Sequence, residues 1–538
     1  MTLCLSGSPP TSTTQSGRTT ESKPPQPPGT IRTINKQQKG HRTVAPIPKI
    51  PQAVPDITFG APVEGTEVLN VRFDADRDHS RGVEISANGE PVEWVVGLPD
   101  APRRASDFSE HNDFLDDGWR AHGAQIVRHM NQVVAGHPVR AKRHLVQLHL
   151  PANIKPRQLR SLIIGVIVGG HQFSTTNEKR PGAVRNLHLA WYNPAHRSID
   201  NRTNLGLRRA VRDGVQLGKA TCLSRDLANA PSNVKSPEWL AKRTKKLVGN
   251  IPGVKVKVRD AEWLRSKGFG GIIAVGSGSS RPPVMVEMVW DPESIGLPQR
   301  RSSIAMVGKG VTFDTGGISI KPAAGMDLMR TDMTGGASVI AAFRALAEGQ
   351  VPRKVVAIVP MAENMVSGDS YRPGDVVEHY GGITSEVTNT DAEGRMVLAD
   401  AISYVAKKYE PNAIISIATL TGAAKLALGL RTGAVFAPTP QVALKLARRG
   451  AQVGEQWWPL PQPKYLEQAV DSKIADVRQA PKGPGATTAS MFLRRFTRGV
   501  DLIHLDIAGP GRAEQTYAEV SPVGTGFGAR TLVQWLAK

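Results

Sequence analysis

The chain has 538 residues, of which 40% are hydrophobic and 21% charged, so two or three globular domains are expected. Its two cysteines, Cys4 and Cys222, exclude a disulfide framework and a cysteine-based zinc site, and they favour a reducing compartment. The net charge of +21 leaves a nucleic-acid partner open, although the sequence contains no zinc-finger or RNA-recognition motif.

Residues 1–55 differ in composition from the rest of the chain. They are rich in proline, serine, threonine and basic residues, and Glu21 is their one acidic residue. Such a segment cannot bury a core and is predicted to be a disordered tail. A serine-rich, acid-poor leader is also typical of an organelle transit peptide. We therefore expect a cytoplasmic protein if the segment is a tail, and a mitochondrial or plastid protein if it is a transit peptide.

The remaining residues are predicted to form two α/β domains. Residues 56–220 are expected to form the first, with a strand at 145–150 and a buried strand at the apolar run 162–168. In residues 221–538 strands and helices alternate, which predicts a larger domain with a mixed or parallel sheet covered by helices. Its expected strands are 304–308, 354–361, 386–390 and 412–420, and its expected helices are 326–346 and 394–409. No apolar stretch reaches the ~20 residues of a membrane span, so no membrane partner is expected.

Charged residues are concentrated in two short segments of this second domain. In Asn389–Arg395, Asp391, Glu393 and Arg395 alternate, and in an extended chain they would lie on one face. Two acids so placed repel each other unless a cation lies between them, and a divalent metal would serve. A solvated strand edge with an Arg–Glu pair would explain the same pattern.

The other segment ends in a glycine-rich turn. Asp314 lies between Lys309 and Lys321, and Asp332 follows near the start of an expected helix. Four carboxylates on separate elements can build a dinuclear site of the oxygen-rich kind that suits Zn²⁺, Mn²⁺ or Mg²⁺. The sequence lacks HExxH, G-x-S-x-G and phosphate-loop motifs, which argues against a zincin, a serine hydrolase of that type and a P-loop enzyme.

Together these segments resemble the leucyl aminopeptidase (cytosol aminopeptidase) family. The hallmark N-T-D-A-E-G-R is unchanged at Asn389–Arg395, and the block G-K-G-x-T-F-D-[ST]-G-G-x-x-x-K is intact at Gly308–Lys321. The resemblance covers about Thr221 to Lys538, and it departs from the family pattern at Thr334–Gly336 and at Gly483–Thr488. Further segments that match are Arg225–Pro231, Glu363–Asn364, Tyr371–Asp375, Ala418–Gly422 and His504–Gly509.

The resemblance implies a metal-dependent aminopeptidase with a catalytic domain at 221–538. It would release Leu-like N-terminal residues from peptides by activating a water between two divalent ions, Zn²⁺ or Mn²⁺. The resemblance assigns one ion to Asp314, Asp391 and Glu393, with the carbonyl of Asp391. It assigns the other ion to Lys309, Asp314, Asp332 and Glu393.

The remaining site residues are also implied by the resemblance. Lys321 would stabilise the developing oxyanion. Arg395 would hold a bicarbonate that relays the proton, because a guanidinium is too basic to do so itself. The first side-chain pocket would be lined by Met329, Thr419, Leu420 and Gly422. His504 and Asp506 are expected to be structural core residues.

The family resemblance further implies a homohexamer. The alternative function, which the net charge of +21 keeps open, is a nucleic-acid-binding or structural protein built on the peptidase scaffold.

Overall fold

The computed structural model of the chain describes residues 50–63, 68–74, 83–85, 91–97, 117–136, 145–175, 183–191, 201–300 and 302–537. The tail or transit segment predicted for residues 1–55 therefore lies almost wholly outside the described residues. Within the described part of the chain, no helix combines the length and apolar character that a membrane span requires.

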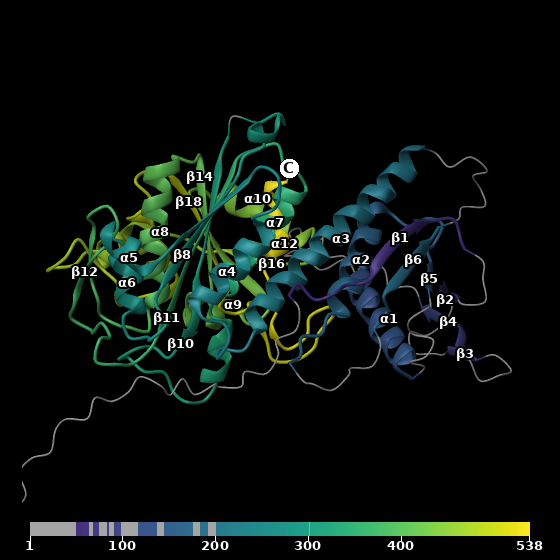
Figure 1. Ribbon diagram of the computed structural model, residues 1–538, viewed down its shortest axis with the longest axis horizontal. Helices are drawn as coiled ribbons and strands as arrows, with labels where there is room; N and C mark the ends of the chain where they lie inside the picture. Colours follow the sequence, from purple (N-terminus) through teal and green to yellow (C-terminus); the bar gives the residue numbers. More distant parts are fainter. Residues whose placement is uncertain are drawn as a thin grey trace, which may run out of the picture. The chain divides into compact units, whose positions relative to one another are not determined.

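The first described part contains a six-stranded sheet (Figure 1). The strand order is β1-β6-β5-β2-β4-β3, and all neighbours are parallel except β3 and β4. The observed strand at Leu145–His149 confirms the one predicted at 145–150. The strands are β1 (Asp56–Gly60), β2 (Val68–Asp74), β3 (Val83–Ile85), β4 (Pro91–Gly97), β5 (Leu145–His149) and β6 (Asn186–Ala190).

The buried strand predicted at 162–168 is wrong, because this run lies inside helix α2 (Pro156–Gly169). Pro156 occupies the first turn, and the side chain of Gln158 accepts a hydrogen bond from the backbone N–H of Lys155 at 2.9 Å, which starts the helix. The run is apolar all round because α2 is enclosed on all sides by α1 (Asp117–Gly136), α3 (Asn201–Asn229) and the core. A helix buried in this way loses the 3.6-residue period that would identify it.

Helix α3 runs through the position where the first domain was expected to end, residue 220. It packs against α2 on one side and against α7 (Thr334–Glu348) on the other. A single helix of 29 residues therefore belongs to both parts of the fold.

The second part is built on a nine-stranded sheet with the order β16-β15-β18-β14-β9-β11-β8-β7, and β10 pairs with β11. The neighbours β18, β14, β9 and β11 run parallel, and β15 is parallel to β16. In contrast, β8 is antiparallel to β11 and β7, and β15 is antiparallel to β18. The mixed sheet that was predicted is therefore confirmed. Its strands are β7 (Val254–Arg259), β8 (Val284–Trp290), β9 (Ile304–Gly308), β10 (Gly310–Asp314), β11 (Val355–Asn364), β14 (Ala413–Ala418), β15 (Thr432–Phe436), β16 (Gln456–Pro459) and β18 (Asp501–Asp506).

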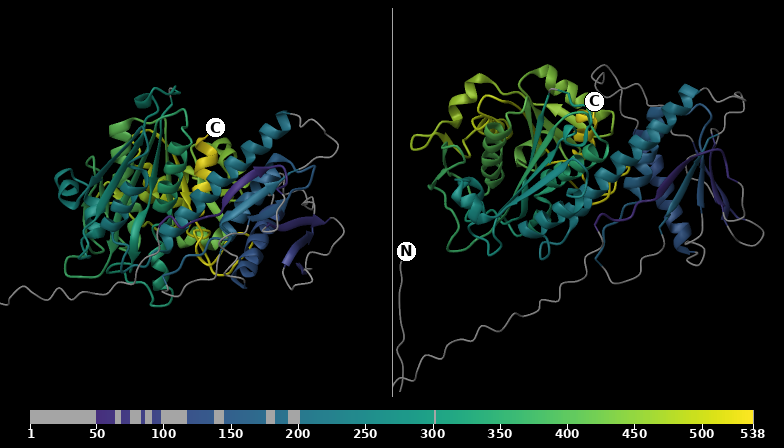
Figure 2. Two further views of the ribbon diagram at one scale, coloured as in Figure 1. Left: turned by 45° about the vertical axis from the view of Figure 1, so that its right-hand side comes forward. Right: turned by 45° about the horizontal axis from the view of Figure 1, so that its top comes forward.

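Helices cover both faces of this sheet, as Figures 1 and 2 show. Strand β11 is buried along its whole length, and its side chains alternate between two cores. Val355, Ala357 and Val359 contribute to the core on one face of the sheet, whereas Val356 and Ile358 contribute to the core on the other face. Burial on both faces explains why this strand is a continuous apolar run in the sequence.

The helices of this part are α4 (Pro237–Val248), α5 (Ala261–Ser266), α6 (Gly270–Gly276), α7, α8 (Glu393–Tyr409), α9 (Gly422–Leu428), α10 (Pro440–Ala451), α11 (Gly485–Arg494) and α12 (Ala529–Leu536). Short 3-10 turns are η1 (Glu293–Ile295), η2 (Met326–Thr331) and η3 (Lys464–Val470). Small strands outside the main sheet are β12 (Val376–Glu378), β13 (Thr384–Glu386), β17 (Val477–Arg478), β19 (Arg512–Ala513) and β20 (Val523–Gly524).

Most elements predicted for this part are found within a few residues. The strand at 304–308 is confirmed without change, and the strands at 354–361 and 412–420 and the helix at 394–409 are confirmed with shifted ends. The strand predicted at 386–390 is wrong beyond Glu386, where β13 ends. The helix predicted at 326–346 is two elements, because η2 ends at Thr331 and α7 begins at Thr334.

Gly165 gives a direct test of the packing between α1 and α2. A Cβ atom at this position would overlap with the backbone oxygen of Arg120 on α1. We expect Gly165→Ala to lower the free energy of unfolding by about 1–3 kcal/mol, because the helices must move apart. In Gly206→Ala, on α3, the new methyl would meet only Pro156 at 3.4 Å, so stability should stay level or rise by about 0.5–1 kcal/mol. Urea denaturation of both variants measures the difference, and equal midpoints would contradict it.

Candidate metal centre

The site lies where the carboxyl ends of the central parallel strands meet. Lys309 follows β9, Asp314 is the last residue of β10, and Thr419 follows β14. Strands β9 and β10 both pair in parallel with β11, and β14 pairs in parallel with β9. The carboxyl ends of these four strands therefore lie at one edge of the sheet. The fold thus brings together residues that are more than a hundred positions apart in the chain.

Two further acids come from the starts of helices. Asp332 lies between η2 and α7, and Glu393 is the first residue of α8. The extended face predicted for Asp391, Glu393 and Arg395 is wrong, because the chain turns at Asp391 and is helical from Glu393 onward. These side chains still reach the same site, since the turn and the helix start both lie at the strand ends.

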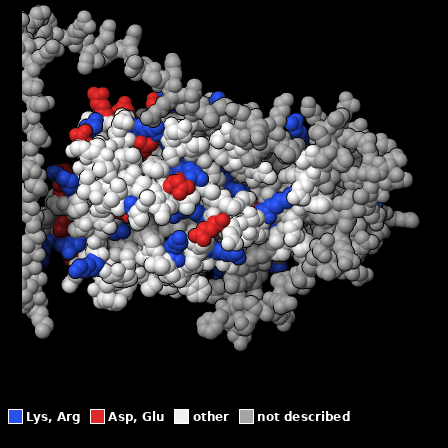
Figure 3. Space-filling model, turned by 90° about the horizontal axis from the view of Figure 1, so that it is seen from below, with Lys and Arg blue, Asp and Glu red and all other residues white. Residues whose placement is uncertain are grey.

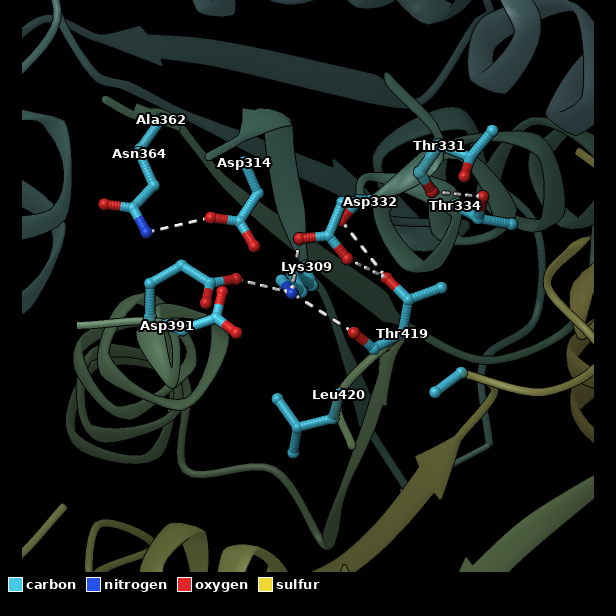
Figure 4. A network of polar contacts seen from close by, with 12 residues as sticks. Lys309, Asp314, Thr331, Asp332, Thr334, Ala362, Asn364, Asp391, Thr419 and Leu420 are labelled. Atoms are coloured by element: carbon cyan, nitrogen blue, oxygen red, sulfur yellow. Dashed lines mark hydrogen bonds and ion pairs between the residues drawn. The ribbon is translucent and has the colours of Figure 1, made fainter. Parts of the chain in front are cut away.

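Lys309 is at the centre of the contacts (Figure 4). Its Nζ lies 2.6 Å from Asp332 Oδ2, 2.6 Å from Glu393 Oε1 and 3.1 Å from the carbonyl oxygen of Thr419. Carboxylate oxygens of Asp314, Asp332 and Glu393 lie within 4.8 Å of one another, and all three residues are buried. Three converging buried carboxylates are a donor set for a cation.

Lys321 holds the other side of the site. Its Nζ lies 2.8 Å from Asp314 Oδ2 and is also hydrogen-bonded to Asp391 Oδ1. The side chain of Asn364, at the end of β11, donates to Asp314 Oδ1 at 2.8 Å (Figure 4). Asp314 therefore has a fixed orientation between Lys321 and Asn364.

Residue 394 has to be a glycine because the side chain of Lys309 occupies the space that a Cβ atom would need. A Cβ atom at residue 394 would lie 2.6 Å from Lys309 Cε and 2.9 Å from Leu420 Cδ1. The glycine in the hallmark segment thus leaves the space through which the lysine side chain reaches the carboxylates.

The electrostatic balance of the site favours bound cations. Burial, followed by the charge of Glu393, raises the pKa of Asp314 to about 7, and burial raises the pKa of Glu393 to about 7 against the charge of Lys309. Burial alone would lower the pKa of Lys309 and Lys321, but the surrounding carboxylates outweigh it and raise both pKa values. With Asp332 and Asp391 included, four carboxylates face two ammonium groups, so negative charge is in excess.

The residues present therefore fit divalent metal ions. The donor atoms are buried carboxylate oxygens and one amine, and their excess negative charge is of the kind that Mn²⁺ or Zn²⁺ neutralises. No ligand predicted from the sequence lies away from this cluster, because each contacts Lys309 or Lys321.

Arg395 lies in the first turn of α8 and is almost fully buried. Its Nη1 donates to the carbonyl oxygen of Gln479 at 2.7 Å, whereas its Nε finds no partner among the described residues. Burial lowers the pKa of Arg395 to about 10, so the guanidinium is charged at neutral pH.

The four residues predicted to contact substrate have different surroundings. Thr419 donates through Oγ to Asp332 Oδ1 at 2.7 Å, which ties it to the carboxylate cluster (Figure 4). Leu420 is half-buried beside Gly394. Gly422 is exposed at the start of α9, and Met329 is half-buried on η2, three residues before Asp332.

Several contacts that hold the site were not predicted from the sequence, and one of the residues that make them, Gln479, was not noted there at all. The Tyr371 hydroxyl donates to the carbonyl oxygen of Thr390 at 2.8 Å, and Thr390 Oγ1 donates to the carbonyl of Gly316 at 2.7 Å. Gln479 contacts the hallmark segment from a distant part of the chain. No periodicity or spacing signals such contacts, because they depend on tertiary structure.

A second constellation resembles a hydrolytic triad but is inaccessible. Ser385 Oγ lies 2.8 Å from His379 Nε2, and His379 Nδ1 lies 2.9 Å from Asp400 Oδ1. All three residues are at most 1% exposed, so no substrate can reach the serine. The chain of hydrogen bonds joins β13 to α8 and is structural.

His504 and Asp506 have the environment of core residues. His504 is buried on β18, and its Nδ1 lies 2.8 Å from Ser416 Oγ. Asp506 accepts hydrogen bonds from Leu420 N at 3.1 Å and from Thr421 Oγ at 2.6 Å, which fixes the loop after β14.

Comparison with known proteins identifies the family. Residues 222–533 match the model of the cytosol aminopeptidase family, catalytic domain. The chain belongs to the cytosol aminopeptidase family. It is therefore a peptidase, a hydrolase, and its family membership with the carboxylate cluster supports a metal-dependent aminopeptidase.

Related family members align over most of this chain. A probable cytosol aminopeptidase of Syntrophotalea carbinolica is 43% identical over 422 residues, which are 77% of this chain and 81% of the relative. A probable cytosol aminopeptidase of Corynebacterium diphtheriae is 43% identical over 342 residues, 62% of this chain and 67% of the relative. The solved bottromycin maturation enzyme BotP in complex with Mn superposes with a TM-score of 0.72 at 31% identity and covers 88% of this chain and 99% of BotP.

The burial of His504 predicts a pH dependence of stability. Burial, followed by the charge of Arg395, lowers the pKa of His504 from 6.5 to about 3. Between these values the unfolded chain binds a proton that the folded chain does not, so stability falls as the pH drops below about 6.5. We expect His504→Asn to reduce this slope by up to about 1.4 kcal/mol per pH unit. Urea unfolding of both proteins between pH 6.5 and 4 measures it, and parallel slopes would contradict the prediction.

Proposed function

We propose that the protein is a dinuclear metallo-aminopeptidase that releases apolar, Leu-like N-terminal residues from peptides. The observation that carries the proposal is the buried cluster of carboxylates around Lys309 and Lys321, which holds more negative than positive charge. Hydrolysis by two metals requires a donor set of this kind, held in place by a rigid scaffold.

The ligands divide into two sets by their contacts. Asp332 and Glu393 pair with Lys309, and Asp314 and Asp391 pair with Lys321. The charges of Asp314 and Glu393 also act on the more distant lysine, so these two carboxylates would help to hold both ions. When bound, the ions would polarise the scissile carbonyl and make the attacking water more acidic. Lys309 would donate a lone pair only as a neutral amine, so it would release its proton on binding a metal.

Lys321 would act as a cation beside the reacting carbonyl. Its side chain is one-fifth exposed, in contrast to the buried Lys309, so it can meet a substrate. The carboxylates around it raise its pKa, which keeps the ammonium charged at neutral pH. A charged, positioned donor of this kind stabilises the oxyanion that develops as the carbonyl is attacked.

Arg395 would hold a small anion such as bicarbonate. Its guanidinium is buried and charged, and its Nε is free of partners within the described part of the chain. A planar anion would satisfy this donor in the geometry that guanidinium groups favour. The anion could then take the proton that Arg395 itself cannot accept.

The preference for Leu-like residues rests on the surroundings of Thr419 and Leu420. Leu420 offers an apolar surface next to Gly394, and Thr419 is fixed by its bond to Asp332. An apolar pocket of this kind distinguishes side chains by about 1–3 kcal/mol per methylene.

The nucleic-acid alternative has no support in these observations. On the face seen in Figure 3, the basic side chains of the described part are spread out, with acidic side chains among them. The homohexamer, the peptide substrates and the cytoplasmic or organellar location stay predictions.

Replacing Glu393 tests the metal site. We expect Glu393→Gln to lower hydrolysis of a leucine anilide by at least about 100-fold and to weaken Mn²⁺ binding, because a buried ligand is lost. The control is Glu287→Gln, which removes an equally buried carboxylate that contacts Tyr404 and Lys408 and lies outside the metal site. This variant should keep the metal-dependent activity of the wild type. The assay compares Mn²⁺-loaded, Zn²⁺-loaded and chelated protein, and includes a glutamate anilide as the test of apolar preference. If the folded, metal-loaded wild type hydrolysed no anilide, this result would contradict the proposed function.

Replacing Lys321 tests oxyanion stabilisation. We expect Lys321→Met to lower kcat by about 10²–10³-fold with KM nearly unchanged, because the interaction strengthens as charge develops on the carbonyl. Lys425→Met, on an exposed position of α9, is the matched control and should behave as wild type. Steady-state kinetics measure both, and a rise in KM alone would instead indicate a role in substrate binding.

A further inference from the structure

The chain segment around Gln479 lies alongside the hallmark segment. Strand β17 pairs in parallel with β13, and the pairing continues as Gln479 N donates to the carbonyl of Glu386 at 2.9 Å. Thr388 Oγ1 then donates to the carbonyl of Ala480 at 3.1 Å. Residues 477–480 therefore follow the backbone that leads into the metal-ligand turn.

The side chain of Gln479 is fully buried and holds this turn from both sides. Its Oε1 accepts from Thr388 N at 3.1 Å and from Asn389 N at 3.0 Å. Its Nε2 donates to the carbonyl of Ala392 at 3.1 Å. Asp391 lies between these contacts, so one amide group fixes the backbone before it and after it.

The main chain of Gln479 contacts a further site residue. Its carbonyl oxygen accepts a hydrogen bond from Arg395 Nη1 at 2.7 Å. Gln479 therefore contacts the backbone before Asp391, the carbonyl of Ala392 directly after it, and Arg395 in the first turn of α8. None of these hydrogen bonds joins Gln479 to a carboxylate of the cluster. Gln479 can therefore act on the metal site only through the residues that it holds.

The neighbouring carbonyl is held independently. The carbonyl oxygen of Thr390 accepts from the Tyr371 hydroxyl at 2.8 Å and from Asn364 Nδ2 at 3.0 Å. With Thr390 held on one side and Ala392 on the other, the peptide unit of Asp391 has little freedom to rotate. Removing the Gln479 amide would release the Ala392 side and leave the Thr390 side in place.

We propose that Gln479 is a positioning residue that sets the orientation of Asp391 and Arg395 and thereby the affinity for the metal ion on the Asp391 side. The proposal rests on the two-metal function proposed above. A glutamine that served stability alone would affect both ions equally or neither.

The test is Mn²⁺ titration calorimetry on full-length, metal-stripped protein, together with thermal unfolding. Gln479→Met keeps the side-chain length and loses all three hydrogen bonds, and Gln479→Asn keeps the amide on a shorter side chain. Gln147→Met is the matched control, because Gln147, on β5 of the six-stranded sheet, is similarly buried. Its amide binds both the N–H and the carbonyl of Val63, which follows β1.

We expect Gln479→Met to weaken one class of Mn²⁺ site by about 10–100-fold and to leave the other within about threefold of wild type. Gln479→Asn should weaken the same class less. Gln147→Met should lower Tm without changing either affinity.

Two outcomes would overturn the proposal: Mn²⁺ affinities of Gln479→Met equal to those of wild type, or both classes weakened to the same extent. A wild type that binds Mn²⁺ but hydrolyses no anilide would overturn the proposed function alone, since the titrations would still report on Gln479. A wild type that binds no Mn²⁺ would overturn both.

Discussion

The structure of the site depends on one electrostatic constraint, the convergence of four carboxylates, three of them buried, with only two ammonium groups to balance them. Asp314, Asp332 and Glu393 have little contact with water, and burial raises the pKa of each. A protein interior tolerates such a charge excess only when protons or a bound cation offset it. The lysines, the glycine-rich turn and the start of α8 are arranged around that requirement.

The sheet provides the rigidity that this arrangement needs. Its central strands are buried on both faces between two cores, so their ends cannot move independently. Because the strands are parallel, residues from β9, β10 and β14 arrive at one edge without long connecting loops. Helices α7 and α8 then begin at that edge and place Asp332 and Glu393 opposite the lysines.

The candidate metal-site residues could be named from the sequence because they lie in or near two short segments that resemble family motifs. Lys309, Asp314 and Lys321 fall within one block, and the strand before them was placed without error.

The prediction at 162–168 failed because a helix buried on all sides has no polar face to reveal its period. The alternation of Asp391, Glu393 and Arg395 was misinterpreted as extended structure, since a turn followed by a helix start can carry the same letters. Tyr371 was noted as part of a segment that matches the family, but its hydrogen bond to the hallmark segment was not predicted. Gln479 left no sequence signal, because hydrogen bonds to distant backbone atoms place no demand on neighbouring residues.

The close contact between Gly394 and Lys309 has a consequence for the redesign of this enzyme. The side chain of Lys309 fills the space next to residue 394, so neither position can be varied alone. A larger residue at 394 becomes possible only if the side chain at 309 is shortened, and a shorter side chain at 309 leaves a void that a methyl group at 394 would fill. Any attempt to exchange the amine of Lys309 for another polar group should therefore change residues 309 and 394 together.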